Sequence, residues 1–186
     1  GFGITLREGP NVRLSSELEG GALFDVGCYP VSVLRAMLGR APRRVVAQAD
    51  WDPSGVDRSL SGLLDYGDGV QGSIACSFDH APHRALRIVG RQGVIETTYP
   101  NTPDPARAHV IGIRRGTAWR MDFDPIEQPP RNGFRCELEA ICALIDGTRN
   151  DQALLRGESI DNAATLAALL ASARSDQWCA VADVSG

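Results

Sequence analysis

The spacing of hydrophobic residues predicts one helix, a run of strands and two closing helices. Apolar side chains recur at helical spacing from Leu23 to Leu38, and Gly39 follows where helices commonly end. Pro30 interrupts this run, so we expect the helix to kink or restart there. The predicted strands are 44–51, 59–66, 70–78, 86–89, 94–98, 110–114 and 118–123. The predicted closing helices are 134–145 and 159–175, the second capped by Ser159 or Asp161.

This order of elements predicts an α+β fold with a largely antiparallel, mixed sheet and helices packed on one face. We see no internal repeat or linker, so residues 1–186 are interpreted as a single domain. A sheet with helices on one side must cover its other face. We therefore expect a homo-oligomer that forms through the open sheet face.

Composition excludes several functions. All 19 basic residues are arginine, so a Walker phosphate loop and Schiff-base chemistry both lack their lysine. The net charge of -4 argues against a nucleic-acid partner. The five cysteines include no CxxC pair, which indicates reduced thiols.

No apolar run suits a membrane span, and we expect a cytoplasmic protein. The chain opens without methionine, so a signal could lie on a preceding part.

Two common cofactor signals are weak or missing. Gly1-Phe2-Gly3 is followed by Leu6, so the dinucleotide fingerprint GxGxxG fails, and we expect no NAD(P) binding by this chain alone. His80 and His83 form an HxxH pair near Asp79, but Pro82 stands between the histidines. We therefore predict no metal site and do not favour a metal hydrolase.

The most informative run is 19–30. Asp25 and Tyr29 stand four residues apart, which on an α-helix places two side chains on one face, about 5–6 Å apart. Gly20, Gly21 and Gly27 leave room for close approach of a backbone, cofactor or substrate. A carboxylate and a phenol there could form an acid/base pair. The same residues also fit a glycine-rich loop entering a helix, with Asp25 as its cap and Tyr29 half buried.

Glu19–Pro30 resembles the GGGxLxDxGxY motif in the second domain of the Gfo/Idh/MocA oxidoreductases. The tyrosine form occurs in the branch with the dihydrodiol and xylose dehydrogenases. Asn11–Arg13, Gly55–Asp57 and Gly90–Gly93 resemble further segments of that family. Glu19 departs from the motif, because it replaces the first glycine. The family's Rossmann domain and the lysine of its Glu-Lys-Pro motif are also absent from this chain.

The resemblance implies the C-terminal, substrate-binding and oligomerisation domain of a longer NAD(P)-dependent oxidoreductase. Its fold would be that of the second domains of glucose–fructose oxidoreductase and glyceraldehyde-3-phosphate dehydrogenase. The reaction would involve CH–OH groups of a sugar, polyol or dihydrodiol. NAD or NADP would be bound mainly by the Rossmann domain, the partner of this domain. The alternative is a non-enzymatic module of the same fold that binds a small ligand or a partner.

The resemblance also implies roles for individual residues. Tyr29 would exchange a proton with substrate, and Asp25 would orient Tyr29 or the family's lysine. That lysine would lower the phenol's pKa from about 10, so we expect this chain to be inactive alone. It also implies that Arg13 contacts the substrate and that Gly21 and Gly27 contact the cofactor. Tyr99, just before Pro100, stands where the wall of a substrate pocket could form, with plain packing as its alternative.

Overall fold

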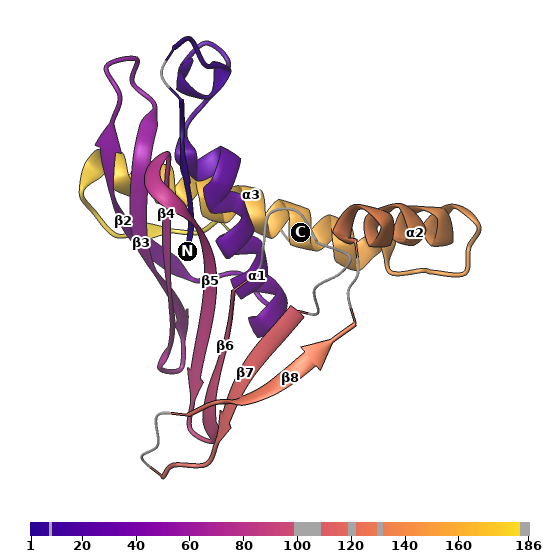
Figure 1. Cartoon of the computed structure of the whole chain (residues 1–186). Coiled ribbons are helices and arrows are strands. Elements are labelled where there is room, and N and C mark those ends of the chain that lie inside the picture. The colour runs from indigo at the N-terminus through magenta and orange to yellow at the C-terminus, as the bar shows by residue number, and fades with distance from the viewer. Residues whose placement is uncertain (8, 99–108, 119–121, 130–131, 183–186) are drawn as a thin grey trace. The chain divides into compact units, whose positions relative to one another are not determined.

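The computed structural model describes residues 1–7, 9–98, 109–118, 122–129 and 132–182. The chain forms two compact units (Figure 1). The first contains residues 1–82 and 153–186, and the second contains residues 83–152. Each unit is described by itself.

The first unit contains a five-stranded mixed sheet. Its strands, in spatial order, are β1 (Phe2–Thr5), β4 (Val70–Ser77), β3 (Asp57–Gly67), β2 (Arg44–Trp51) and β9 (Cys179–Ala180). β1 runs parallel to β4, with Phe2 opposite Cys76. The other neighbouring pairs are antiparallel. The sequence therefore predicted the mixed, mainly antiparallel character correctly.

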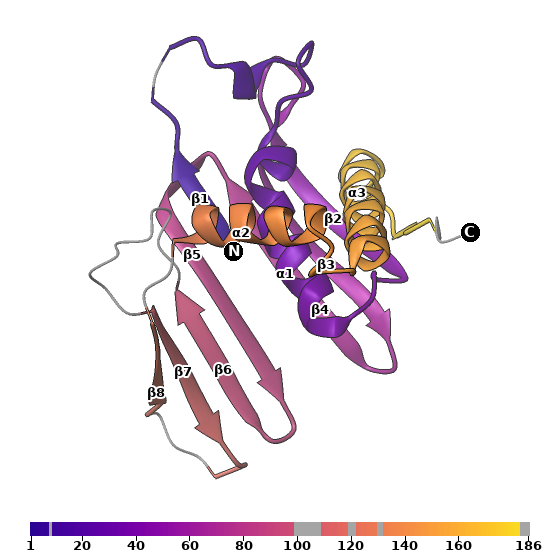
Figure 2. The ribbon, with the colours of Figure 1, turned by 90° about the vertical axis from the view of Figure 1, so that its right-hand side faces the viewer.

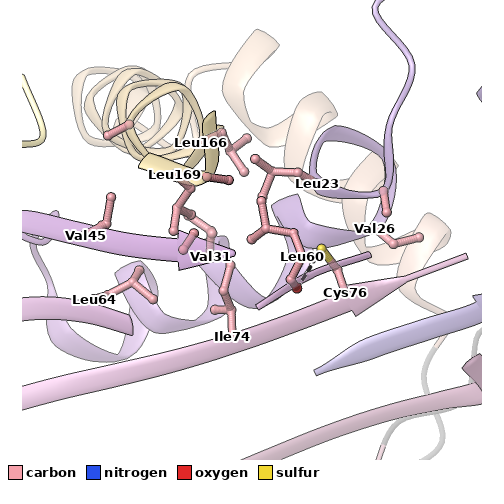
Figure 3. Close-up of a cluster of buried hydrophobic side chains, with 14 of the residues drawn as sticks. Leu23, Val26, Val31, Val45, Leu60, Leu64, Ile74, Cys76, Leu166 and Leu169 are labelled. Atoms are coloured by element: carbon pink, nitrogen blue, oxygen red, sulfur yellow. Dashed lines mark hydrogen bonds between the residues drawn. The ribbon is translucent and has the colours of Figure 1, made fainter. Parts of the chain in front are cut away.

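Helices cover one face of this sheet. The helical elements of this part are η1 (Val12–Leu14), η2 (Leu23–Gly27), α1 (Cys28–Leu38) and α3 (Gln152–Ser175). Along β3, Leu60 and Leu64 are buried, whereas Leu63 on the opposite face is 53% exposed. Figure 3 shows the buried side chains packed between strands and helices. Leu169 of α3 approaches β3 where Gly62 has no side chain: a Cβ there would lie 2.8 Å from Leu169 Cδ2. The predicted one-sided packing is confirmed for this unit.

The second unit contains antiparallel strands and one helix. Its elements are β5 (Asp79–Gly90), which begins in the first unit, β6 (Gly93–Thr98), β7 (His109–Arg115), β8 (Asp124–Gln128) and α2 (Gly133–Ile145). β5 to β8 are neighbours in chain order (Figure 2). Ile88, Ile95 and Ile113 are opposite one another and form a half-buried aliphatic row. The hairpin predicted around Gly90 and Gly93 is confirmed.

Several predicted boundaries differ from the structure. β5 begins at Asp79, seven residues before the strand predicted at 86–89. Residues 119–121 of the strand expected at 118–123 lie outside the described residues, and the next described strand, β8, begins at Asp124. Phe123 packs on β7 instead: its Cβ lies 3.2 Å from the position of a Cβ on Gly112, and Arg114 lies over its ring.

The long closing helix, α3, begins at Gln152, seven residues before the predicted start at Ser159. Ser159 and Asp161 are therefore interior residues and not caps. The Ser159 hydroxyl donates to the Leu155 carbonyl, and Asp161 accepts a hydrogen bond from Arg35. The segment 152–158 contains mostly good helix formers, which extend the helix beyond its apolar pattern.

In the described part of the chain, no helix is both long and apolar enough to cross a membrane. The longest, α3, carries Arg156, Glu158 and Asp161 in its first half.

Candidate active site

The segment before the first helix is fixed against η1. The backbone N–H of Gly21 donates to the Arg13 carbonyl at 2.8 Å, and that of Gly20 donates to the Ser15 carbonyl at 2.9 Å. A Cβ on Gly20 would lie 2.3 Å from the Arg13 carbonyl oxygen, so only glycine allows this approach. Asn11 caps η1 by accepting from the Arg13 N–H. These contacts hold Arg13 beside the start of the helix.

Arg13 and Asp25 form an ion pair. Arg13 Nε donates to Asp25 Oδ2 at 2.7 Å, with the two side chains 44% and 32% exposed. Two of the predicted site residues, 12 positions apart in sequence, are thus brought together. The reading of Asp25 as a helix cap is wrong, because the backbone groups at the helix start bind another carboxylate.

That carboxylate belongs to Asp57. The spacing of residues near the motif did not indicate a role for it. Asp57 Oδ2 accepts the N–H of Leu23 at 2.7 Å, and the side chain is 1% exposed. Burial raises the pKa of Asp57, while hydrogen bonds from backbone N–H groups, including those of Leu23 and Ala22, and the positive charge of Arg174 lower it. The only signal in the sequence was the Gly55–Asp57 segment of the family resemblance.

The helix that carries Tyr29 begins with a wide turn. Residues 23–27 form a π-helical turn, and α1 continues from Cys28. We predicted that the helix kinks or restarts at Pro30. The α-helix starts at Cys28, two residues earlier, and Pro30 lies inside α1. Pro30 has no N–H to donate to the Val26 carbonyl, which explains why regular α-helical bonding fails at this turn. Such turns are common at functional sites.

Tyr29 lies at the protein surface and is 49% exposed. Its ring packs against Phe2 of β1, with the ring centroids 5.1 Å apart and tilted by 54°. The contact with β1 restrains the phenol ring on one side and leaves half of its surface open to solvent. Four residues, about one helical turn, separate Tyr29 from Asp25.

The buried glycines of the motif are close to this protein's own side chains. A Cβ on Gly21 would lie 2.3 Å from Asp57 Oδ1, and one on Gly27 would lie 2.9 Å from Cys76 Sγ. Packing inside the chain thus explains both glycines. This packing does not test whether the two glycines contact a cofactor, and that contact stays a prediction.

Four further residues singled out in the sequence are Tyr99, Asp79, His80 and His83. Tyr99 lies outside the described residues. Asp79, His80 and His83 are strand residues of β5. Arg58 binds Asp79 through two nitrogens and lowers its pKa. Within the described ranges, no three His, Cys, Asp or Glu side chains come together as they would around a metal ion.

The sequence and the fold identify an oxidoreductase C-terminal domain. The sequence model of the GFO/IDH/MocA C-terminal domain matches residues 3–96. The chain therefore belongs to the GFO/IDH/MocA family, which confirms the resemblance seen in its motifs.

Curated relatives include dehydrogenases of sugars and dihydrodiols. The chain is 30% identical over 174 residues to D-xylose 1-dehydrogenase (NADP(+)) 2 of Haloferax volcanii, covering 92% of this chain and 52% of that protein. It is 31% identical over 96 residues to trans-1,2-dihydrobenzene-1,2-diol dehydrogenase of Xenopus tropicalis, covering 51% and 29%. The chain spans about half the length of the xylose dehydrogenase.

Solved structures show the same fold. A 3-ketoreductase from Actinomadura kijaniata in complex with NADP and TDP-benzene superposes with a TM-score of 0.79 at 21% identity, covering 92% of this chain and 51% of that one. Aldose-aldose oxidoreductase from Caulobacter crescentus, complexed with glycerol, gives 0.75 at 20% identity, covering 96% and 53%. The predicted α+β class is thereby confirmed.

Proposed function

We propose that this chain is the substrate-binding domain of an NAD(P)-dependent oxidoreductase that acts on the CH–OH group of a sugar, polyol or dihydrodiol. The observation that carries this proposal is the Arg13–Asp25 ion pair at the start of the helix that presents Tyr29 to solvent. The family membership and the relatives named as xylose and dihydrodiol dehydrogenases support it.

In this proposal the Tyr29 phenol is the group that transfers the proton. Oxidation of a CH–OH group releases one hydride from carbon and one proton from oxygen. A bound nicotinamide supplies the hydride acceptor, and the Tyr29 phenolic oxygen takes the proton. A phenol titrates near 10, so a neighbouring cation is needed to make the phenolate available near neutral pH. This chain has no lysine, so an amine for this task must come from outside it.

Arg13 and Asp25 position the substrate. Asp25 accepts from Nε of Arg13, which fixes the plane of the guanidinium group. The two Nη groups have no partner among the described residues and can donate to substrate oxygens. An arginine stays protonated, so Arg13 binds and orients while Tyr29 transfers the proton.

The test uses a polypeptide that contains this chain together with its Rossmann domain. We expect oxidation of at least one substrate among sugars, inositols and dihydrodiols with NAD or NADP, and none with the chain alone. Turnover by the chain alone, or none by the longer protein, would contradict the proposal. Ligand binding without turnover would favour the alternative, a non-enzymatic binding module.

We also infer a second copy of this chain as a partner. The uncovered face of β3 exposes Leu63 between polar neighbours such as Ser61. Light scattering should show a dimer or larger assembly that Leu63→Arg weakens. A strict monomer at high concentration would contradict this inference.

A further inference from the structure

We propose that Asp57 is a positioning residue for Tyr29, and that its buried carboxylate fixes the start of the helix that carries the phenol. This inference rests on the proposed function, because it assigns Asp57 a part in placing the reacting group. Asp57 contacts neither substrate nor the phenol in this account. It acts through the backbone of the helix.

Asp57 is itself held rigidly. It is the first residue of β3, a central strand paired with β2 on one side and β4 on the other. The loop before it is closed by a hydrogen bond from the Asp52 N–H to the Val56 carbonyl. The carboxylate therefore projects from a fixed point of the sheet toward the helix.

The carboxylate links that point to the helix start. Asp57 Oδ2 accepts the N–H of Leu23 at 2.7 Å. Oδ1 lies so close to Gly21 that a Cβ there would be 2.3 Å away. The strand and the helix start are thus joined directly through this side chain, so we expect its replacement to shift the helix start.

The helix transmits such a shift to the site. Leu23 lies two residues before Asp25 and six before Tyr29, within one continuous helical run. Its side chain is fully buried and resists lateral movement. A displacement of about 1 Å at a reacting group can cost about 100-fold in rate. The capping bond therefore controls the placement of the phenol from a distance.

The charge and the acceptor of this carboxylate are both expected to matter. A carboxylate only accepts, whereas an amide presents an NH2 group on one side. Asp57→Asn would keep an oxygen that can accept the Leu23 N–H but would remove the negative charge, which weakens that hydrogen bond. Asp57→Ala would remove the acceptor and leave the buried N–H of Leu23 unpaired.

A double-mutant cycle in the longer protein separates positioning from mere stability. We expect Asp57→Ala to lower kcat by roughly 10–100-fold when Tyr29 is present, with a smaller change in KM. In the Tyr29→Phe background the same substitution should have almost no further effect on kcat, because there is no phenol left to misplace. Asp57→Asn should give an intermediate loss. Asp65→Asn, on the same strand and paired with Arg44, is the matched control and should leave kcat unchanged.

A second measurement needs no turnover. With 3-fluorotyrosine in the chain, the resonance missing from Tyr29→Phe identifies Tyr29, and Asp57→Asn should shift it while Asp65→Asn does not. An equal loss of kcat in both backgrounds, or an unmoved resonance, would overturn the inference. Equal turnover of the parent and Tyr29→Phe would instead contradict the proposed function. A failure of the Asp57 inference can therefore be distinguished from a failure of the proposed function. If Asp57→Ala does not fold, Asp57→Asn serves in the same cycle.

Discussion

Gly21→Ala tests the contact on which the site depends. Gly21 has a φ of +122°, a backbone conformation that residues with a Cβ rarely adopt. An added Cβ would lie 2.3 Å from Asp57 Oδ1, well inside contact distance. The carboxylate has to move, and its hydrogen bond to the Leu23 N–H has to lengthen or break.

The expected destabilisation has two parts. Backbone strain at a positive φ costs about 1–2 kcal/mol. Weakening a buried hydrogen bond to a charged group costs about 1.5–3 kcal/mol. The unfolding free energy should therefore fall by about 3–5 kcal/mol.

Urea unfolding of the chain measures this loss, and Gly55→Ala is its control. Gly55 has a φ of +93° and no atom within 4 Å of its Cβ position, so it incurs strain without a collision. We expect Gly55→Ala to cost about 1–2 kcal/mol, clearly less than Gly21→Ala. Equal losses for the two variants would refute the reasoning about Asp57.

Three further outcomes are expected. Leu169→Ala should lower the unfolding free energy by about 2–5 kcal/mol, because it empties space beside Gly62; a loss below about 1 kcal/mol in urea unfolding would contradict this packing. Arg13→Ala should change stability by less than about 1 kcal/mol, because its ion pair with Asp25 is partly exposed, yet it should raise KM in the longer protein; an unchanged KM would exclude a substrate contact. Burial raises the pKa of Asp57, so the folded state holds that proton more tightly than the unfolded chain. The stability of the parent relative to Asp57→Asn should therefore fall as pH rises from the unfolded value of about 3.9 through the raised folded value; a rise would contradict the direction of the shift.

Local patterns predicted much of the fold. The alternation in β3 and β4, the hairpin at Gly90 and Gly93, and helix α2 were all recognisable, because their burial follows the period of the element itself. The start of α3 was missed because its first turns lack an apolar stripe. The position of β8 was missed because Phe123 packs on β7 without joining a strand.

The sequence proposed three residues of the candidate site but not the contacts between them. Arg13, Asp25 and Tyr29 came from a motif, whereas their arrangement depends on tertiary structure. The helix cap is the clearest case, because Asp57 lies 34 residues from Leu23, whose N–H donates a hydrogen bond to it. The wide turn at 23–27 was not predicted, although the missing N–H of Pro30 explains it, because the effect falls on the turn before the proline.

The most direct test of the proposed function is the turnover of Tyr29→Phe in the longer protein. The substitution keeps the ring that packs on Phe2 and removes only the phenolic oxygen, so the fold should be preserved. We predict that kcat falls by about 100–10,000-fold, the usual contribution of one acid/base group, while the unfolding free energy changes by less than about 1 kcal/mol. An unchanged kcat would contradict the assignment of Tyr29 as the proton-transfer group.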